Sequence, residues 1–164
     1  MKKLFAALGL CSLLAGCATP YIDDNYRSVA QDSRVQFIVL HYTSEPLADS
    51  LRILTTQDVS AHYLIANNGK LYQLVADEER AWHAGVSSWR GRGACNDFSL
   101  GIELEGCDSI AFTDSQYAVL NRLIDELRAR YPIVDVVGHS DIAPGRKTDP
   151  GPCFEWARLK LQSE

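Results

Sequence analysis

Segments with the pattern of β-strands alternate along this chain with segments of helical periodicity, and this alternation limits the possible folds more than any other feature. Val35 to Tyr42 is rich in β-branched and aliphatic residues, whereas Pro46 to Gln57 carries leucines at helical spacing. Ser99 to Glu105 alternates apolar and polar residues, as a strand with one core face and one acidic face does, and Val134 to Val137 is a short apolar run. Interleaved strands and helices indicate an α/β fold in which helices cover one sheet.

Two further segments carry specific local signals. Residues 62–66 and 70–75 flank Asn67-Asn68-Gly69, whose residues tolerate positive φ, so these segments predict a hairpin. Thr113 and Gln116 have the spacing of a capping box, which predicts the start of a helix. Apolar residues then recur at helical spacing: Tyr117, Leu120, Leu123, Ile124, Leu127 and Tyr131.

The C-terminal part of the chain has a mixed pattern. Glycines and prolines punctuate Gly138 to Pro152, which predicts a long ordered loop, and Phe154 to Leu161 predicts a closing helix.

With 164 residues, 46% of them hydrophobic and 23% charged, the chain has room for one core. We therefore expect a single folded domain over residues 34–164.

The first residues have the layout of a secretory signal. Lys2 and Lys3 precede the apolar run Leu4 to Leu14, which is too short to span a bilayer. The run ends in Leu14-Ala15-Gly16-Cys17, which resembles the lipobox of bacterial lipoproteins. This resemblance implies a signal peptide over residues 1–16, acyl chains on Cys17, a lipidated tether over residues 17–33, and a place on the periplasmic face of the outer membrane. The alternative is a plain signal peptide that happens to contain a cysteine.

Charge and cysteine content exclude other classes of function. The formal net charge is -5 and no dense Lys/Arg run occurs, which argues against nucleic acid as a partner. The mature domain keeps Cys95, Cys107 and Cys153. One disulfide is possible among these three, but the sequence does not select the pair. No CxxC motif points to thiolate zinc or redox chemistry.

Two of the four histidines follow predicted strands, where α/β proteins place their sites. His41 follows the run Phe37 to Leu40, and His139 follows Val136-Val137-Gly138. Asp149 lies ten positions after His139, across a loop stiffened by prolines. Two imidazoles and one carboxylate leave a fourth tetrahedral position of a zinc ion open for water, as in catalytic zinc sites. The spacing alone is weak evidence, because most proteins contain two histidines and an aspartate.

Whole segments carry a more specific signal. Residues 82–87 (WHAGVS), 95–106 (CNDFSLGIELEG), 138–139 (GH) and 146–152 (RKTDPGP) closely resemble the AmpD-type amidases. These belong to a family that also includes phage T7-type lysozymes and peptidoglycan recognition proteins. The resemblance covers about residues 35–161 and implies a mixed β-sheet flanked by helices. It also implies a zinc-dependent N-acetylmuramoyl-L-alanine amidase, which acts on peptidoglycan or muropeptides and which we expect to be a monomer.

The resemblance assigns roles to individual residues. It places the Zn²⁺ ligands at His41, His139 and Asp149, and the catalytic acid/base and cation at Glu103 and Lys147. Without the resemblance, pairing of Lys147 with Asp141 or Asp149 at the surface would be the preferred interpretation.

Other polar residues near these segments allow two interpretations. Trp82, His83 and Arg92 are candidate substrate contacts, although core packing is an equal alternative for the first two. Glu105 is more simply interpreted as a solvated carboxylate, and His62 as a hydrogen-bonded structural histidine.

The resemblance divides at the front of the domain. The lipoprotein signal and residues 37–44 (FIVLHYTS) are similar to a branch of outer-membrane lipoprotein amidases, and the connection from His41 to Ser60 is shorter than in the AmpD type. Tyr42 and Ala94 also depart from that type, so a strict preference for 1,6-anhydro-muropeptides over intact peptidoglycan does not follow. The alternative function is a noncatalytic peptidoglycan-binding lipoprotein, but the complete set of ligands and catalytic residues argues against it.

Overall fold

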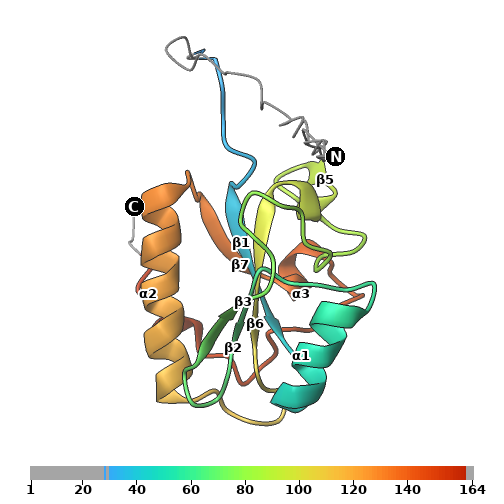
Figure 1. The fold of residues 1–164 in the computed structure, drawn as a ribbon, viewed down its shortest axis with the longest axis vertical. Coiled ribbons are helices and arrows are strands. Elements are labelled where there is room, and N and C mark those ends of the chain that lie inside the picture. The colour runs from blue at the N-terminus through green and yellow to red at the C-terminus, as the bar shows by residue number, and fades with distance from the viewer. Residues whose placement is uncertain (1–27, 29, 162–164) are drawn as a thin grey trace, which may run out of the picture. The chain divides into compact units, whose positions relative to one another are not determined.

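The computed structural model describes residue 28 and residues 30–161 (Figure 1). The chain divides after Gln31, and all elements described below belong to the unit that begins at Asp32. The predicted signal peptide, lipobox and most of the tether lie outside the described residues. No helix in the described part of the chain is both long and apolar enough to cross a membrane.

Five strands form one mixed sheet in the order β3-β2-β6-β1-β7. They are β1 (Phe37–Tyr42), β2 (Tyr63–Ile65), β3 (Leu71–Gln73), β6 (Ser99–Leu104) and β7 (Asp135–Gly138). β1 pairs in parallel with β6 and β7, β2 pairs in parallel with β6, and only β3 runs antiparallel, as the second strand of the predicted hairpin. The expected α/β fold with a mixed sheet is confirmed.

Helices lie on both sides of this sheet (Figure 1). α2 (Asp114–Arg130) begins at the predicted capping box and packs its apolar stripe against one face, where Leu120, Ile124 and Leu127 are buried in the larger core. α3 (His139–Ile142) lies on the other side, where Ile142 joins a smaller cluster with Val39. α1 (Leu47–Thr56) lies on that side too, and Ser50 is its only buried residue.

The prediction of a closing helix over residues 154–161 is wrong. Only a single 3₁₀ turn, η2 (Trp156–Arg158), forms there. Side chains of α2 take the backbone donors that a helix would use: the Glu155 N–H donates to the Tyr117 hydroxyl at 2.7 Å, and the Lys160 N–H donates to Asn121 Oδ1 at 2.7 Å. Because these long-range hydrogen bonds satisfy the backbone, the segment follows the surface of α2 in an extended course.

Four short elements were not predicted. α3 begins inside the expected loop after Gly138, whose N–H donates to Asp141 Oδ2 at 2.7 Å. A two-stranded sheet joins β4 (Ser88–Trp89) to β5 (Arg92–Gly93), and the 3₁₀ turn η1 (Cys95–Asp97) follows. Elements this short carry little periodicity, so the sequence signal for them is weak.

The register of the parallel strands explains where a site can form. His41 on β1 lies opposite Glu103 on β6, and Leu40 lies opposite Gly138 at the end of β7. The C-terminal ends of three adjacent strands therefore bring His41, Glu103 and His139 to one edge of the sheet, which is where open α/β sheets bind ligands.

Candidate active site

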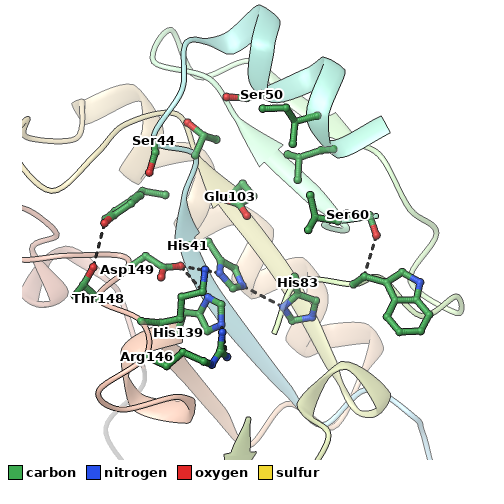
Figure 2. A pocket seen from close by; sticks show the side chains of 17 residues that line it. His41, Ser44, Ser50, Ser60, His83, Glu103, His139, Arg146, Thr148 and Asp149 are labelled. Carbon is green, nitrogen blue, oxygen red and sulfur yellow. Dashed lines mark hydrogen bonds and ion pairs between the residues drawn. The ribbon is translucent and has the colours of Figure 1, made fainter. Parts of the chain in front are cut away.

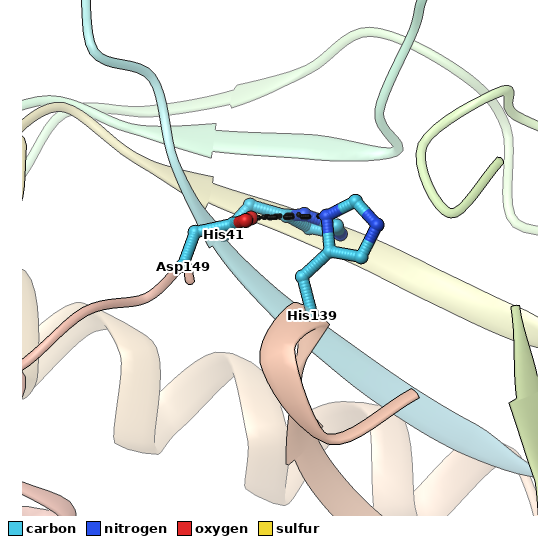
Figure 3. A group of neighbouring side chains, drawn as sticks. All are labelled: His41, His139 and Asp149. Atoms are coloured by element: carbon cyan, nitrogen blue, oxygen red, sulfur yellow. Dashed lines mark hydrogen bonds and ion pairs between the residues drawn. The ribbon is translucent and has the colours of Figure 1, made fainter. Parts of the chain in front are cut away.

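The structure brings the three predicted metal ligands together (Figure 3). His41 lies near the end of β1, His139 is the first residue of α3, and Asp149 reaches back from the following loop. Asp149 Oδ2 lies 2.8 Å from His41 Nδ1 and 3.1 Å from His139 Nδ1. All three residues are buried, and their donor atoms lie within 4.8 Å of one another. Two imidazoles and a carboxylate at this separation form a donor set suited to one metal cation.

Local packing holds the loop of Asp149 against the start of α3. The Ser140 N–H donates to the Asp149 carbonyl at 2.9 Å. Pro150 packs so closely on Gly138 that a Cβ built there would lie 2.8 Å from the proline Cδ. A glycine directly before His139 therefore allows the carboxylate loop to approach the histidine.

The environment of the ligands also sets their charge. Burial lowers the pKa of His41 to about 4, although the contact with Asp149 acts in the opposite direction. Burial alone would raise the pKa of Asp149, but the two histidines beside it reverse that effect and lower it below its ordinary value. At neutral pH the site therefore presents an unprotonated His41 and an ionised Asp149.

The ligands form part of the lining of a cavity of about 370 Å³ (Figure 2). Glu103 lines it from β6, and its Oε2 is buried with no hydrogen-bond partner among the described residues. Burial raises the pKa of Glu103 well above its ordinary value, an effect that the charge of Asp149 increases and that of Lys147 opposes. A buried carboxyl without a partner, beside a metal-ligand set, has the features of a proton acceptor for a bound reactant.

Lys147 lines the same cavity. The alternative that it pairs with an aspartate finds no support, since no ion pair within residues 30–161 includes it and Asp141 instead caps α3. Among the residues that the structure describes, Lys147 is therefore a cation in the cavity lining without an ion-pair partner.

The three candidate substrate contacts have different positions. Trp82 lines the cavity and is 56% exposed, with the Arg80 guanidinium 4.2 Å above its ring. His83 also lines the cavity, but its ring is hydrogen-bonded. Arg92 does not belong to the cavity lining: its guanidinium lies 3.8 Å from the centre of the Phe98 ring. The structure thus brings Trp82 and His83 to the site and leaves Arg92 outside it.

Glu105 and His62, the two other polar residues considered in the sequence, both make structural hydrogen bonds. Glu105 Oε2 accepts a hydrogen bond from the Asn67 N–H at 2.8 Å. His62 is fully buried; its Nε2 lies 3.1 Å from the Glu79 carbonyl and its Nδ1 accepts the Gly101 N–H at 3.0 Å.

The three cysteines of the domain are free thiols. Cys95 is buried, whereas Cys107 and Cys153 are half-buried. None of them lines the cavity.

Sequence reasoning missed several residues around the ligands. Ser99 Oγ is hydrogen-bonded to the ring of His83, and Asn96 Oδ1 accepts the backbone N–H of the same residue. Arg146 donates to the Ala84 carbonyl at 2.7 Å. Ser99 shares its strand face with Glu103, so the period of two in β6 could have identified it. On the opposite wall, residues of the short front connection line the cavity: Ser50, Ile53, Leu54 and Val59.

Comparison with known proteins relates this geometry to one family. The family model described as N-acetylmuramoyl-L-alanine amidase matches residues 31–152. The 1,6-anhydro-N-acetylmuramyl-L-alanine amidase AmpD of Citrobacter freundii is 56% identical over 104 residues, which are 62% of this chain and 56% of that protein. The chain therefore spans little more than half the length of this relative.

Two other relatives match more of the chain. The N-acetylmuramoyl-L-alanine amidase AmiD of Escherichia coli K12 is 40% identical over 99% of this chain and 68% of that protein. Its solved complex with anhydro-N-acetylmuramic acid-L-Ala-D-gamma-Glu-L-Lys has a TM-score of 0.77 at 41% identity, over 84% of this chain and 61% of that one. AmpDh3 of Pseudomonas aeruginosa has a TM-score of 0.80 at 42% identity, over 86% of this chain and 65% of that one.

Proposed function

The chain belongs to the N-acetylmuramoyl-L-alanine amidase family, and from this premise we propose that it is a zinc-dependent amidase of peptidoglycan. The bond cut is the amide between N-acetylmuramic acid and the L-alanine of the stem peptide. The observation that carries the proposal is the convergence of His41, His139 and Asp149 beside the unpartnered carboxyl of Glu103 in one cavity.

The residues present fit a zinc ion. Zinc accepts imidazole nitrogen and carboxylate oxygen, and a set of three protein ligands leaves one position open. His41 and His139 would bind it through Nδ1 and Asp149 through its carboxylate, the atoms that already converge. When bound, a zinc ion polarises the scissile carbonyl and lowers the pKa of water toward neutrality.

Glu103 and Lys147 supply the proton transfer and the positive charge. Glu103 accepts a proton from the attacking water as the C–O bond forms. It returns that proton to the alanine nitrogen as the C–N bond breaks, which leaves a carboxylic acid on the muramic acid and an amine on the peptide. The second proton of the water then passes from the acid to the amine, so the products are a carboxylate and an ammonium group. A carboxyl whose pKa is raised by burial is suited to both steps. Lys147 stabilises the negative charge that develops on the carbonyl oxygen.

The substrate class follows from the relatives and the cavity. AmiD was solved with an anhydro-muramoyl peptide, which supports muropeptides or peptidoglycan as the substrate here. Trp82 offers an exposed aromatic side chain beside the cavity, and aromatic rings of this kind suit contact with a sugar or a peptide. We include both ordinary and 1,6-anhydro muramic acid in the proposed range.

The proposed location follows from the first residues. Leu14-Ala15-Gly16-Cys17 supports cleavage after residue 16, acylation of Cys17, a tether to residue 33 and attachment to the periplasmic face of the outer membrane. Cys17→Ser should release the protein from membrane fractions, and an unchanged distribution after fractionation would refute lipidation.

Incubation with intact sacculi and with anhydro-muropeptides tests the activity. We expect the chain to release stem peptides, chelator to abolish this release and added zinc to restore it. His41→Ala, His139→Ala and Asp149→Ala should each be inactive. Full activity in excess chelator would refute the zinc mechanism. Binding to sacculi without any release of peptide would favour the noncatalytic peptidoglycan-binding alternative.

A further inference from the structure

A two-residue segment, His83-Ala84, contacts both histidine ligands on the side away from the metal position. His83 Nδ1 lies 3.0 Å from His41 Nε2 (Figure 2). The Ala84 carbonyl lies 3.0 Å from His139 Nε2. Neither contact belongs to the reaction itself, but both bear on which ring nitrogen of each ligand carries its proton. A histidine can bind a metal through Nδ1 only if that atom has a free lone pair.

The tautomer of His139 follows directly from its partner. A backbone carbonyl can only accept a hydrogen bond, so the contact with Ala84 requires a proton on His139 Nε2. Arg146 Nη2 also lies 3.3 Å from this nitrogen, but its two protons are directed to the Ala84 and Val86 carbonyls, each at 2.7 Å. The lone pair of the neutral ring then lies on Nδ1, the atom that faces Asp149.

The tautomer of His41 follows from a longer chain of hydrogen bonds. Ser99 Oγ donates its single proton to the Cys95 carbonyl at 2.6 Å, so this oxygen can only accept from His83 Nε2, 3.3 Å away. His83 therefore carries its proton on Nε2 and has a lone pair on Nδ1. That lone pair accepts the proton of His41 Nε2, which leaves Nδ1 of His41 free for the metal. The carbonyl at the end of the chain sets the direction of every bond in it.

Two further residues hold this segment in place. Asn96 Oδ1 accepts the N–H groups of both His83 and Ala84, at 3.1 Å and 2.8 Å, and Asn96 is buried. Gly101 provides the space for the ring of His83, because a Cβ built on Gly101 would lie 2.5 Å from His83 Cγ. Backbone and ring of His83 are therefore constrained independently.

We propose that His83, supported by Ser99 and Asn96, is a positioning residue of the metal centre, which holds His41 in the tautomer that presents Nδ1. This assigns His83 a role other than the substrate contact that the sequence suggested. The inference rests on the proposed function, because it concerns the same metal site. Partners that orient metal ligands in this way typically contribute about 10-fold to 100-fold to metal affinity.

The test compares two replacements of His83 in the full chain, with the zinc dissociation constant measured by competition with a chromophoric chelator. His83→Asn keeps an acceptor on Cγ, where Nδ1 stands, whereas His83→Leu fills more of the space but cannot accept. We expect His83→Leu to bind zinc about 10-fold to 100-fold more weakly than the parent and His83→Asn to recover most of that loss. The visible absorption of the cobalt-substituted proteins should change in the same order. A role in packing alone would make Asn the worse replacement, because it is smaller than the ring.

His62→Leu is the matched control. His62 is also a buried, hydrogen-bonded histidine, and its ring centre lies 5.7 Å from that of His83, but the structure gives it no hydrogen bond to a ligand. It should cost stability while zinc affinity stays within about 3-fold of the parent. If His83→Leu does not fold, Ser99→Ala decides the matter, since it removes the acceptor for His83 Nε2 and should weaken zinc binding by more than about 3-fold.

The outcomes separate this inference from the proposed function. A parent chain that binds no zinc would overturn the proposed function. A parent that binds zinc, with His83→Leu binding as tightly, would overturn only the positioning role. Equal losses in His83→Asn and His83→Leu would also overturn it, because the acceptor would then have no effect.

Discussion

Gly101→Ala is the substitution whose effect the structure defines most directly. A Cβ at this position would lie 2.5 Å from Cγ, 2.7 Å from Nδ1 and 2.9 Å from Cβ of His83. The backbone of β6 has no freedom to retreat, because Gly101 pairs with Val39 on one side and exchanges hydrogen bonds with His62 on the other. The ring of His83 must therefore move.

The size of the effect follows from this geometry. Ordinary van der Waals contact begins near 3.4 Å, so the ring must retreat by about 0.9 Å from the 2.5 Å contact. Overpacking of this kind costs about 1–3 kcal/mol. The displaced ring also loses its bonds to His41 and Ser99, at about 1 kcal/mol each. We expect a total loss of about 3–5 kcal/mol in the free energy of unfolding, a large share of the stability of a domain this size.

Urea unfolding of the metal-free chain measures this loss, and a double-mutant cycle identifies its cause. In a His83→Ala background the new methyl group has no ring to meet, so Gly101→Ala should cost less than about 1 kcal/mol there. Zinc affinity should stay weak in the double variant, because the acceptor for His41 is still absent. The reasoning is refuted if Gly101→Ala costs the same in both backgrounds.

Three other predictions concern single side chains. Glu103→Gln should lower turnover by about 10²-fold to 10⁴-fold while the zinc dissociation constant stays within about 3-fold, and an unchanged turnover would remove its role as acid and base. Lys147→Met should lower kcat by about 10²-fold to 10³-fold with a smaller change in KM, which steady-state kinetics on one muropeptide would measure; a change confined to KM would contradict a role in the transition state. Burial lowers the pKa of His62 from 6.5 to about 4, so the unfolded chain binds a proton in this window that the folded chain excludes, and stability is lost as the pH falls from 6.5 toward 4. The metal-free His62→Leu variant should lose stability over this window with a slope smaller by up to about 1.4 kcal/mol per pH unit, and parallel curves for variant and parent would show that His62 does not contribute.

Local signals predicted the parts of the fold that local interactions determine. The hairpin around residues 67–69 and the helix from Thr113 formed as expected, because turn residues and a capping box act within a few positions. The segment 154–161 failed because its backbone donors bond to side chains of α2, including Tyr117. No periodicity within the segment could show a competition between partners so far apart in sequence.

The site also has residues that sequence patterns could predict and residues that they could not. His41 and His139 could be proposed from their places at strand ends, since parallel strands bring their C-terminal ends to one edge. Glu103 and Lys147 came only from the family resemblance, because a carboxylate in an alternating strand and a lysine in a loop have many ordinary explanations. The surroundings of His83 escaped prediction, since they depend on hydrogen-bond directions that only coordinates contain.

The face of β6 that the sequence suggested to be acidic contributes to the site through three residues. Side chains of a strand alternate with a period of two, so Ser99, Gly101 and Glu103 point to the same side. Ser99 accepts from the ring behind the metal site, Gly101 leaves room for that ring, and Glu103 enters the cavity two residues later. The opposite face carries Leu100 and Ile102, which are fully buried against the core that α2 covers. Substitutions on the two faces should therefore have different effects. Replacing Leu100 or Ile102 should lower the stability of the fold, because these side chains contribute through packing alone. Replacing Ser99, Gly101 or Glu103 should change zinc binding or turnover, because these residues act on the proposed metal ligands or on the reactant.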